Sequence, residues 1–183
     1  MVYKVIVKNG NDLSFKERKE MHKIEHDTFD PTSKYTPLDS DDKLKDIYFI
    51  LKDKRKLLSF AILERVSVTF RKKSYTLAGI GDMISVVRGK GYGKQIMTAM
   101  RKYAKAKKWT VVGFCGRHNT EFYVNCAYKI AKNEVIRFIH KKKYGTLEKN
   151  TWDKDVVYIT GRNNFMKEFL AHKKDIVWVP YHW

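Results

Sequence analysis

The chain has 183 residues, and its 38 lysines and arginines against 20 aspartates and glutamates give a formal net charge of +18. This length predicts one domain over residues 1–183. A hydrophobic content of 43% with 14% aromatic residues excludes a disordered polycation. No apolar run approaches the roughly 18 residues of a membrane span, and charge appears too early for a signal peptide. We therefore expect a soluble, cytoplasmic protein with no membrane partner.

The two cysteines, Cys115 and Cys126, are too few for a disulfide scaffold and lack the spacing of a metal finger. No metal site is expected.

The positive charge is concentrated in the second half of the chain. Residues 1–87 contain 17 basic and 13 acidic side chains, whereas residues 88–183 contain 21 and 7. A polyanion, either nucleic acid or a phosphorylated cofactor, is expected to bind mainly there. The 29 lysines against 9 arginines argue against base-specific recognition, because bidentate base contacts favour arginine. A lysine-rich composition that serves only solubility is the alternative explanation.

In chain order, alternating apolar residues first predict a strand over residues 2–7. Ser14 and Glu17 have the spacing of a capping box, which predicts a helix that begins there and that Pro31 ends. Residues 39–42 are expected to form a loop or a second helix cap.

The central part of the chain changes from strand to helical periodicity. Residues 47–52, 57–68 and 75–87 predict an antiparallel meander. Residues 91–107 predict an amphipathic helix, and the apolar run 109–114 predicts a buried strand beside a parallel neighbour. The last expected elements are a short helix over residues 119–126, a strand from Ile130 and a terminal strand over residues 156–160. This order predicts an α+β fold.

The loop at residues 88–94 has the most informative pattern, because a strand passes through alternate glycines into a helix. Alternate glycines permit left-handed backbone and close approach of a ligand. The helix N-terminus adds unpaired amides and a positive dipole end. The sequence therefore predicts a pyrophosphate-binding loop made of Arg88, Gly89, Lys90, Gly91, Tyr92, Gly93 and Lys94. A plain turn and helix cap is the alternative.

Two common phosphate motifs do not match. A Walker loop requires Ser or Thr where Gln95 follows Lys94, and the dinucleotide fingerprint requires a different glycine spacing. The segment from Arg88 to Gly93 instead resembles the Arg/Gln-x-x-Gly-x-Gly/Ala signature of the GCN5-related N-acetyltransferases (GNAT family). In that family the loop holds the pyrophosphate of acetyl-CoA.

A second segment resembles the same family. Phe122 and Tyr123, followed by Ala127 and Tyr128, match its Phe-Tyr-x-x-x-Gly-Phe region, with alanine in place of the glycine. The resemblance implies a GNAT-type acyl-CoA N-acyltransferase fold: a central, mostly antiparallel sheet with splayed parallel strands and flanking helices. It also implies that acetyl-CoA is the cosubstrate and that Asn119 and Phe122 join the loop in binding it.

The resemblance further implies direct transfer of an acetyl group to a primary amine, of a small molecule or a protein, within a ternary complex. The backbone of Ile84, Ser85 and Val86 would meet the pantetheine arm and polarise the thioester. Tyr123 would protonate the departing sulfur, or else it packs on its helix. The loop before Arg88 is about three residues shorter than is usual in the family.

The general base is expected to be a carboxylate. Asp82 is the only one in the strand-like segment 75–87, and it would accept the proton of the amine unless it anchors a neighbouring loop. Glu64 on the adjacent strand is the alternative base. His26 and His118 are less favoured, and Cys115 is expected to be a small buried hydrophobe rather than a nucleophile.

Three further alternatives remain open from the sequence. The chain shows a weaker resemblance to the aminoglycoside 2′-N-acetyltransferase subgroup. A different class of function is a basic nucleic-acid or ribosome-binding module that uses Lys94, Arg101, Lys105 and Lys108, although nucleic acid is not the favoured partner. The protein is expected to be a monomer or a homodimer, and the acyl acceptor is not identified.

Overall fold

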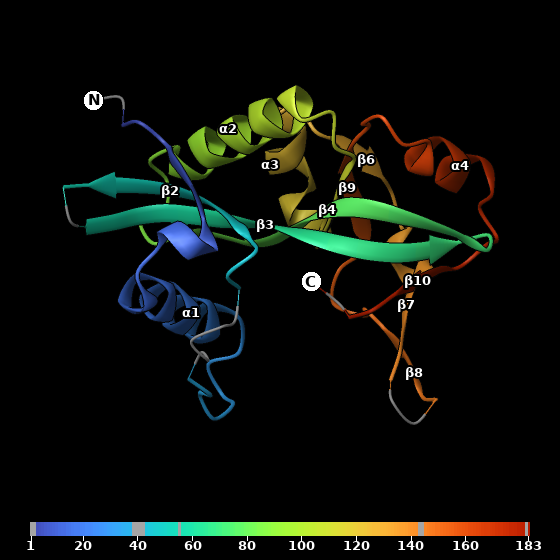
Figure 1. Cartoon of the computed structure of the whole chain (residues 1–183), viewed down its shortest axis with the longest axis horizontal. Coiled ribbons are helices and arrows are strands. Elements are labelled where there is room, and N and C mark those ends of the chain that lie inside the picture. Colours follow the sequence, from blue (N-terminus) through green and yellow to red (C-terminus); the bar gives the residue numbers. More distant parts are fainter. Residues whose placement is uncertain (1–2, 38–42, 55, 143–144, 182) are drawn as a thin grey trace. The chain divides into compact units, whose positions relative to one another are not determined.

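The computed structural model (Figure 1) describes residues 3–37, 43–54, 56–142, 145–181 and 183. The chain forms two compact units. The first unit contains Met1–Leu63 and Asp82–Ile96, and the second contains Glu64–Gly81 and Met97–Trp183. The expected loop or cap at residues 39–42 lies outside the described residues.

The elements give an α+β protein with a mixed sheet, as the sequence predicts. The helices are α1 (Phe15–Phe29), α2 (Tyr92–Ala106), α3 (Thr120–Asn125) and α4 (Phe165–Ala171), with 3-10 helices η1 (Gly10–Asp12), η2 (Arg117–Asn119) and η3 (Val135–Arg137). The strands are β1 (Ile6–Asn9), β2 (Ile47–Asp53), β3 (Lys56–Phe70), β4 (Lys73–Ser85), β5 (Val111–Cys115), β6 (Lys129–Ala131), β7 (Phe138–Lys141), β8 (Leu147–Lys149), β9 (Asp155–Ile159) and β10 (Val177–Val179).

In the first unit, α1 packs against antiparallel strands. β1 pairs with β2, and β2 pairs with β3 up to Leu63. The predicted capping box opens α1, because Ser14 Oγ accepts the Glu17 N–H at 3.2 Å and Glu17 Oε2 accepts the Ser14 N–H at 3.1 Å. The helix ends at Phe29, two residues before Pro31. Its apolar side shares a core with the strands that contains Leu13, Met21, Tyr48, Ile50, Leu57, Phe60, Ile62 and Ile84.

In the second unit, the strand order is β6-β9-β5-β4-β3-β10-β7-β8. β4 is parallel to β5, with Ala78 opposite Val111 and Gly79 opposite Val112. β10 is parallel to β7, whereas the other pairings whose register is resolved are antiparallel. The apolar run before Cys115 is therefore a buried strand with a parallel neighbour, as predicted.

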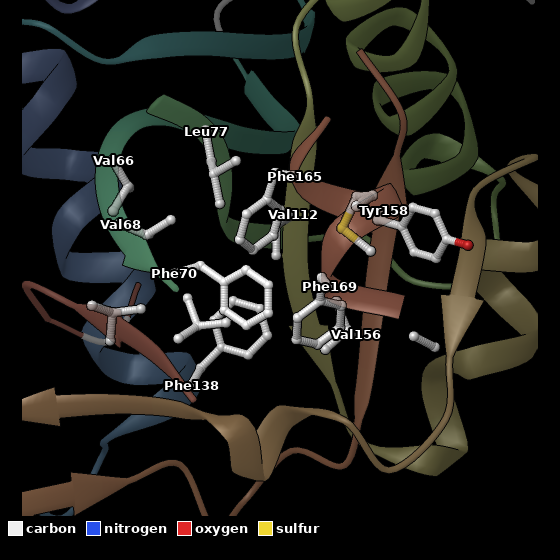
Figure 2. Packing of buried hydrophobic residues seen from close by; sticks show 14 of the residues in the cluster. Val66, Val68, Phe70, Leu77, Val112, Phe138, Val156, Tyr158, Phe165 and Phe169 are labelled. Atoms are coloured by element: carbon white, nitrogen blue, oxygen red, sulfur yellow. The ribbon is translucent and has the colours of Figure 1, made fainter. Parts of the chain in front are cut away.

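Four phenylalanines from three elements form the centre of the second unit's core (Figure 2): Phe70 from β3, Phe138 from β7, and Phe165 and Phe169 from α4. All four are fully buried. The rings of Phe165 and Phe169 stack at 5.7 Å, and Phe70 meets Phe165 edge-on at 5.9 Å. This packing fixes α4 to the sheet.

The C-terminal third differs from the sequence expectation. The strand predicted over residues 156–160 is present as β9, but it is not terminal, because α4 and β10 follow it. The elements η3, β7 and β8 are also additional to the expected order. The first strand begins at Ile6 rather than at residue 2. Helix α4 has only seven residues, too few for periodicity to identify, and its burial against distant rings is what stabilises it.

Phe165→Ala should lower the free energy of unfolding by about 3–5 kcal/mol, because it removes a fully buried ring and leaves a cavity. Urea unfolding followed by circular dichroism measures the loss. Trp152→Ala is the control, because Trp152 is 90% exposed and its truncation should change stability little. A loss of less than about 1 kcal/mol at Phe165 would mean that α4 is not anchored by this ring.

Candidate active site

The loop between β4 and α2 requires glycine at two positions. Gly89 and Gly91 both have φ of +74°, and a Cβ built on either would meet nothing within 4 Å. The space beside each glycine is open, so the requirement comes from left-handed backbone and not from packing. A loop of this kind presents main-chain atoms to a ligand without side chains in the way.

Helix α2 continues directly from this loop. Its first helical hydrogen bond runs from the Gln95 N–H to the Gly91 carbonyl at 3.2 Å. The amides of the preceding first turn have no partner within the helix and point out of its N-terminus. Arg88, Lys90 and Lys94 are all exposed around them. The arrangement suits an anion such as a pyrophosphate, held by amides and surrounded by mobile cations.

Tyr92 has a neighbour of its own within the first unit. Its ring meets Tyr3 edge-on at 5.7 Å. Gly93 is buried at the start of α2. Both residues were expected to bind cofactor; the ring contact of Tyr92 and the burial of Gly93 are what the structure gives for them.

The last residues of β4 turn their backbone alternately toward β3 and away from it. Ser59 Oγ donates to the Ile84 carbonyl at 2.8 Å, and the Val86 N–H donates to the Leu58 carbonyl at 3.0 Å. The backbone at 84 and 86 is therefore directed to β3. Because successive residues of a strand alternate in direction, the backbone groups of Ser85 face away from β3.

Asp82 interrupts β4 with a left-handed backbone, at φ of +47°. Aspartate tolerates this conformation better than most residues, but at a cost in strain. Its carboxylate accepts a hydrogen bond from Lys43 Nζ at 3.2 Å, and the same ammonium reaches Glu25 Oε2 at 2.8 Å. His22 Nδ1 lies 3.2 Å from that Glu25 oxygen. Two carboxylates thus share one ammonium.

Burial and neighbouring charge set the protonation of this cluster. Burial raises the pKa of Asp82 to about 6, with Lys43 opposing the shift and Glu25 reinforcing it. Burial acts in the same direction on Glu25, but the charge and hydrogen bond of Lys43 outweigh it and hold the pKa of Glu25 below its usual value. Asp82 is therefore the carboxylate that exchanges a proton near neutral pH, which is what a general base requires.

The other candidate acid and base lie in the second unit. Tyr123 on α3 is 8% exposed, and burial raises its pKa above the usual value. Its ring contacts Phe122 at 5.1 Å and Tyr128 at 6.1 Å, both edge-on. The hydroxyl is protonated at neutral pH, as in an ordinary tyrosine, and burial makes it a weaker acid. Glu64, the alternative base, accepts a hydrogen bond from the Tyr181 hydroxyl at 3.1 Å.

The contacts of the remaining candidate residues do not suggest a catalytic role. Asn119 is exposed and precedes α3 without capping it through its side chain. Thr120 holds the start of α3 by donating to Asp155 Oδ2 at 2.8 Å. Burial raises the pKa of Cys115 to about 11, so the thiolate needed for nucleophilic attack is not formed at neutral pH. His26 lies 3.2 Å from the Ser33 carbonyl.

The part of the chain that the structure describes contains neither a cluster of metal-ligating side chains nor a membrane-spanning helix. No group of three His, Cys, Asp or Glu side chains there could hold a metal ion. No helix among those residues is long and apolar enough to cross a membrane.

Comparison with solved structures identifies the fold. An acyl-CoA N-acyltransferase from Pseudomonas aeruginosa is 15% identical, with a TM-score of 0.55 over 85% of this chain and 97% of that one. An N-acetyltransferase from Staphylococcus aureus Mu50 is 17% identical, with a TM-score of 0.58 over 87% and 98%. The fold is that of the GNAT acyl-CoA N-acyltransferases.

The GNAT fold is shared with a further group of acyl-CoA enzymes. The CoA-dependent acyl-homoserine lactone synthase BjaI is 9% identical, with a TM-score of 0.60 over 94% of this chain and 90% of that one. No protein-family model matches the chain, and no curated protein resembles it in sequence. At these identities the likeness establishes the fold and not the substrate.

The partners of Asp82 could not be inferred from the sequence. Lys43 lies 39 residues away in the chain and Glu25 lies 18 residues from Lys43. Neither belongs to a motif, and charged residues at such separations are ordinarily read as solvated surface. Only the folded first unit brings them together.

A carboxyl-carbon NMR titration should give Asp82 a pKa of about 6, with Asp82→Asn used to assign the signal. Lys43→Gln should move this titration to higher pH by about 1 to 3 pH units, because it removes the opposing positive charge. Glu25→Gln should move it to lower pH, because it removes a repelling carboxylate. Titration of Asp82 below pH 4 in the unmodified protein, or shifts of equal sign in the two variants, would contradict this cluster.

Proposed function

We propose that the protein is an N-acetyltransferase that moves an acetyl group from acetyl-CoA to a primary amine by direct transfer. The observation that carries the proposal is the loop in which Gly89 and Gly91 adopt left-handed backbone immediately before α2. This cradle fits a pyrophosphate, because a Cβ at either glycine would project into the open space that a ligand would use. The N-acyltransferases among the fold neighbours support the same reaction class.

In the proposed reaction, the amine attacks the thioester carbonyl, a C–N bond forms, and the C–S bond breaks to release CoA. A backbone N–H near Ser85, directed away from β3, would polarise the carbonyl oxygen. Asp82 would take the proton that the amine loses. With a pKa of about 6, its carboxylate is largely ionised at pH 7 yet basic enough to accept that proton.

Tyr123 would return a proton to the departing sulfur. Its hydroxyl carries a proton at neutral pH, as an ordinary tyrosine does, and burial raises its pKa further, which makes it a weaker acid. The competing role is packing, since the ring already contacts Phe122 and Tyr128. Kinetics of the hydroxyl-deleted variant separate the two roles.

Acetyl-CoA should raise the melting temperature of the protein, and Gly91→Asp should abolish that rise. The substitution strains a left-handed residue and places a negative charge among the amides that would meet pyrophosphate. Gly145→Asp is the matched control, because Gly145 also has positive φ, at +82°, and open space beside it. Both variants should lose stability, but only Gly145→Asp should keep the rise with acetyl-CoA. A rise preserved in Gly91→Asp would remove the assignment of this loop.

Tyr123→Phe should lower kcat by roughly 10²–10³ and leave the affinity for acetyl-CoA nearly unchanged, because general-acid catalysis contributes about 10²–10⁴-fold. A thiol-release assay across a panel of amines and peptides first identifies a working acceptor. Tyr158→Phe is the control, since Tyr158 is an equally buried tyrosine of the second unit at 8% exposure. Equal activities of Tyr123→Phe and Tyr158→Phe would mean that Tyr123 has a packing role and does not act as the acid.

A further inference from the structure

A pocket in the second unit lies where α2 ends and β5 begins. It is an open pocket of about 740 Å³, a volume within the range of small-ligand sites. None of the residues around it belongs to the acyl-transfer site described above. Its lining comes from β3, β4, the α2–β5 turn and the loop after β9.

The pocket is lined by cations without counterions. Arg65, Lys107, Lys108 and Arg162 all contribute to it, and no aspartate or glutamate does. Among the described residues, no ion pair joins any of the four to a carboxylate. All four side chains are exposed, and an anion in the pocket would reduce the repulsion that remains among their charges. The cavity is therefore electrostatically matched to a multiply charged anion.

The helix dipole does not account for this cluster. Lys107 and Lys108 follow the C-terminus of α2, where cations are favoured in any protein. Arg65 comes from β3 and Arg162 from the loop between β9 and α4, so the dipole offers no reason for their presence. Three distant parts of the chain direct positive charge to one place.

Arg65 is held by an aromatic ring. Its guanidinium carbon lies 4.2 Å from the centre of the Trp109 ring, and Trp109 in turn meets the Tyr103 ring edge-on at 5.8 Å. A guanidinium oriented by stacking keeps its N–H donors for another partner. Burial without a neighbouring carboxylate also lowers the pKa of Arg65. Arginine in this state is suited to bidentate contact with a phosphate.

The floor of the pocket is fixed by hydrogen bonds. The Gly161 N–H donates to Thr110 Oγ1 at 3.1 Å, the Arg162 N–H donates to the Lys108 carbonyl at 2.8 Å, and Asn163 Nδ2 donates to the Thr76 carbonyl at 3.0 Å. A Cβ at Gly161 would lie 2.2 Å from the backbone nitrogen of Thr110. The two walls thus approach as closely as glycine allows, which fixes the backbone from which Lys108 and Arg162 extend.

We propose that this pocket binds the phosphate groups of a nucleotide, either free or within a single strand of RNA. Sites for single strands combine a positively charged groove with aromatic side chains, and here four cations surround an indole. An acidic peptide would pair with the same cations, but its carboxylates would not require the Trp109 ring or the rigid guanidinium fork. The inference does not depend on acyl transfer.

The test is fluorescence anisotropy with a labelled octauridylate at 50 to 200 mM salt. The Arg65→Gln/Arg162→Gln variant should bind at least tenfold more weakly than the unmodified protein. Its log–log salt slope should be shallower by about 1.4, because each phosphate contact to a single strand contributes about 0.7. The matched control is Lys129→Gln/Lys132→Gln, which removes two exposed cations of the same unit and should bind within about threefold of the unmodified protein. Circular dichroism melts confirm that both variants fold.

Competition assigns the source of the phosphates. Displacement of the strand by ATP supports a free nucleotide, whereas displacement only by unlabelled strand supports nucleic acid. Equal losses of affinity in the two double variants would overturn the proposal, because they would mean diffuse attraction to a +18 protein. The proposal would also be overturned if neither octauridylate nor ATP bound at 50 mM salt. The same holds if octaglutamate displaced the labelled strand as effectively as the unlabelled strand does.

Discussion

A single ammonium is shared by two half-buried carboxylates in the first unit, and the chemistry proposed for that unit depends on it. Lys43 joins Glu25 of α1 to Asp82 of β4, so three segments distant in the chain meet at one charge. Buried ion clusters lose much of their attraction to desolvation, so the cluster is not chiefly a source of stability. Its consequence is electrostatic: one carboxylate remains ionised while Asp82 titrates near pH 6.

Backbone geometry and surface charge have different roles in this protein. The loop at Gly89 and Gly91 offers main-chain amides and helix polarity, which need no strong local charge to bind phosphate. The excess of cations in the second half of the chain is thus not explained by the loop alone. In the second unit, the pocket beside Trp109 gathers part of that excess in one place, where Arg65 stacks on the Trp109 ring. The two proposals together give the protein two separate places for phosphate.

Most of the local structure could be predicted, because its causes are local. The capping box at Ser14, the helical spacing that starts after Gly91 and the apolar run before Cys115 each act over a few residues. The α4–β10 segment could not be predicted, because its stabilising contacts are with rings of β3 and β7. The same is true of Asp82: its position on a strand was evident, whereas its left-handed backbone and its partners at 25 and 43 were not.

The sequence by itself determined the glycine loop before α2, since left-handed glycines followed by a helix N-terminus are properties of adjacent residues. It also determined the class of fold through the order and period of its elements. Tertiary structure alone decided which ionisable groups have shifted pKa values and which charges lie close together. The raised pKa values of Asp82 and Tyr123 and the gathering of cations around Trp109 all depend on burial or on chain segments that are distant in sequence, and a linear pattern contains neither.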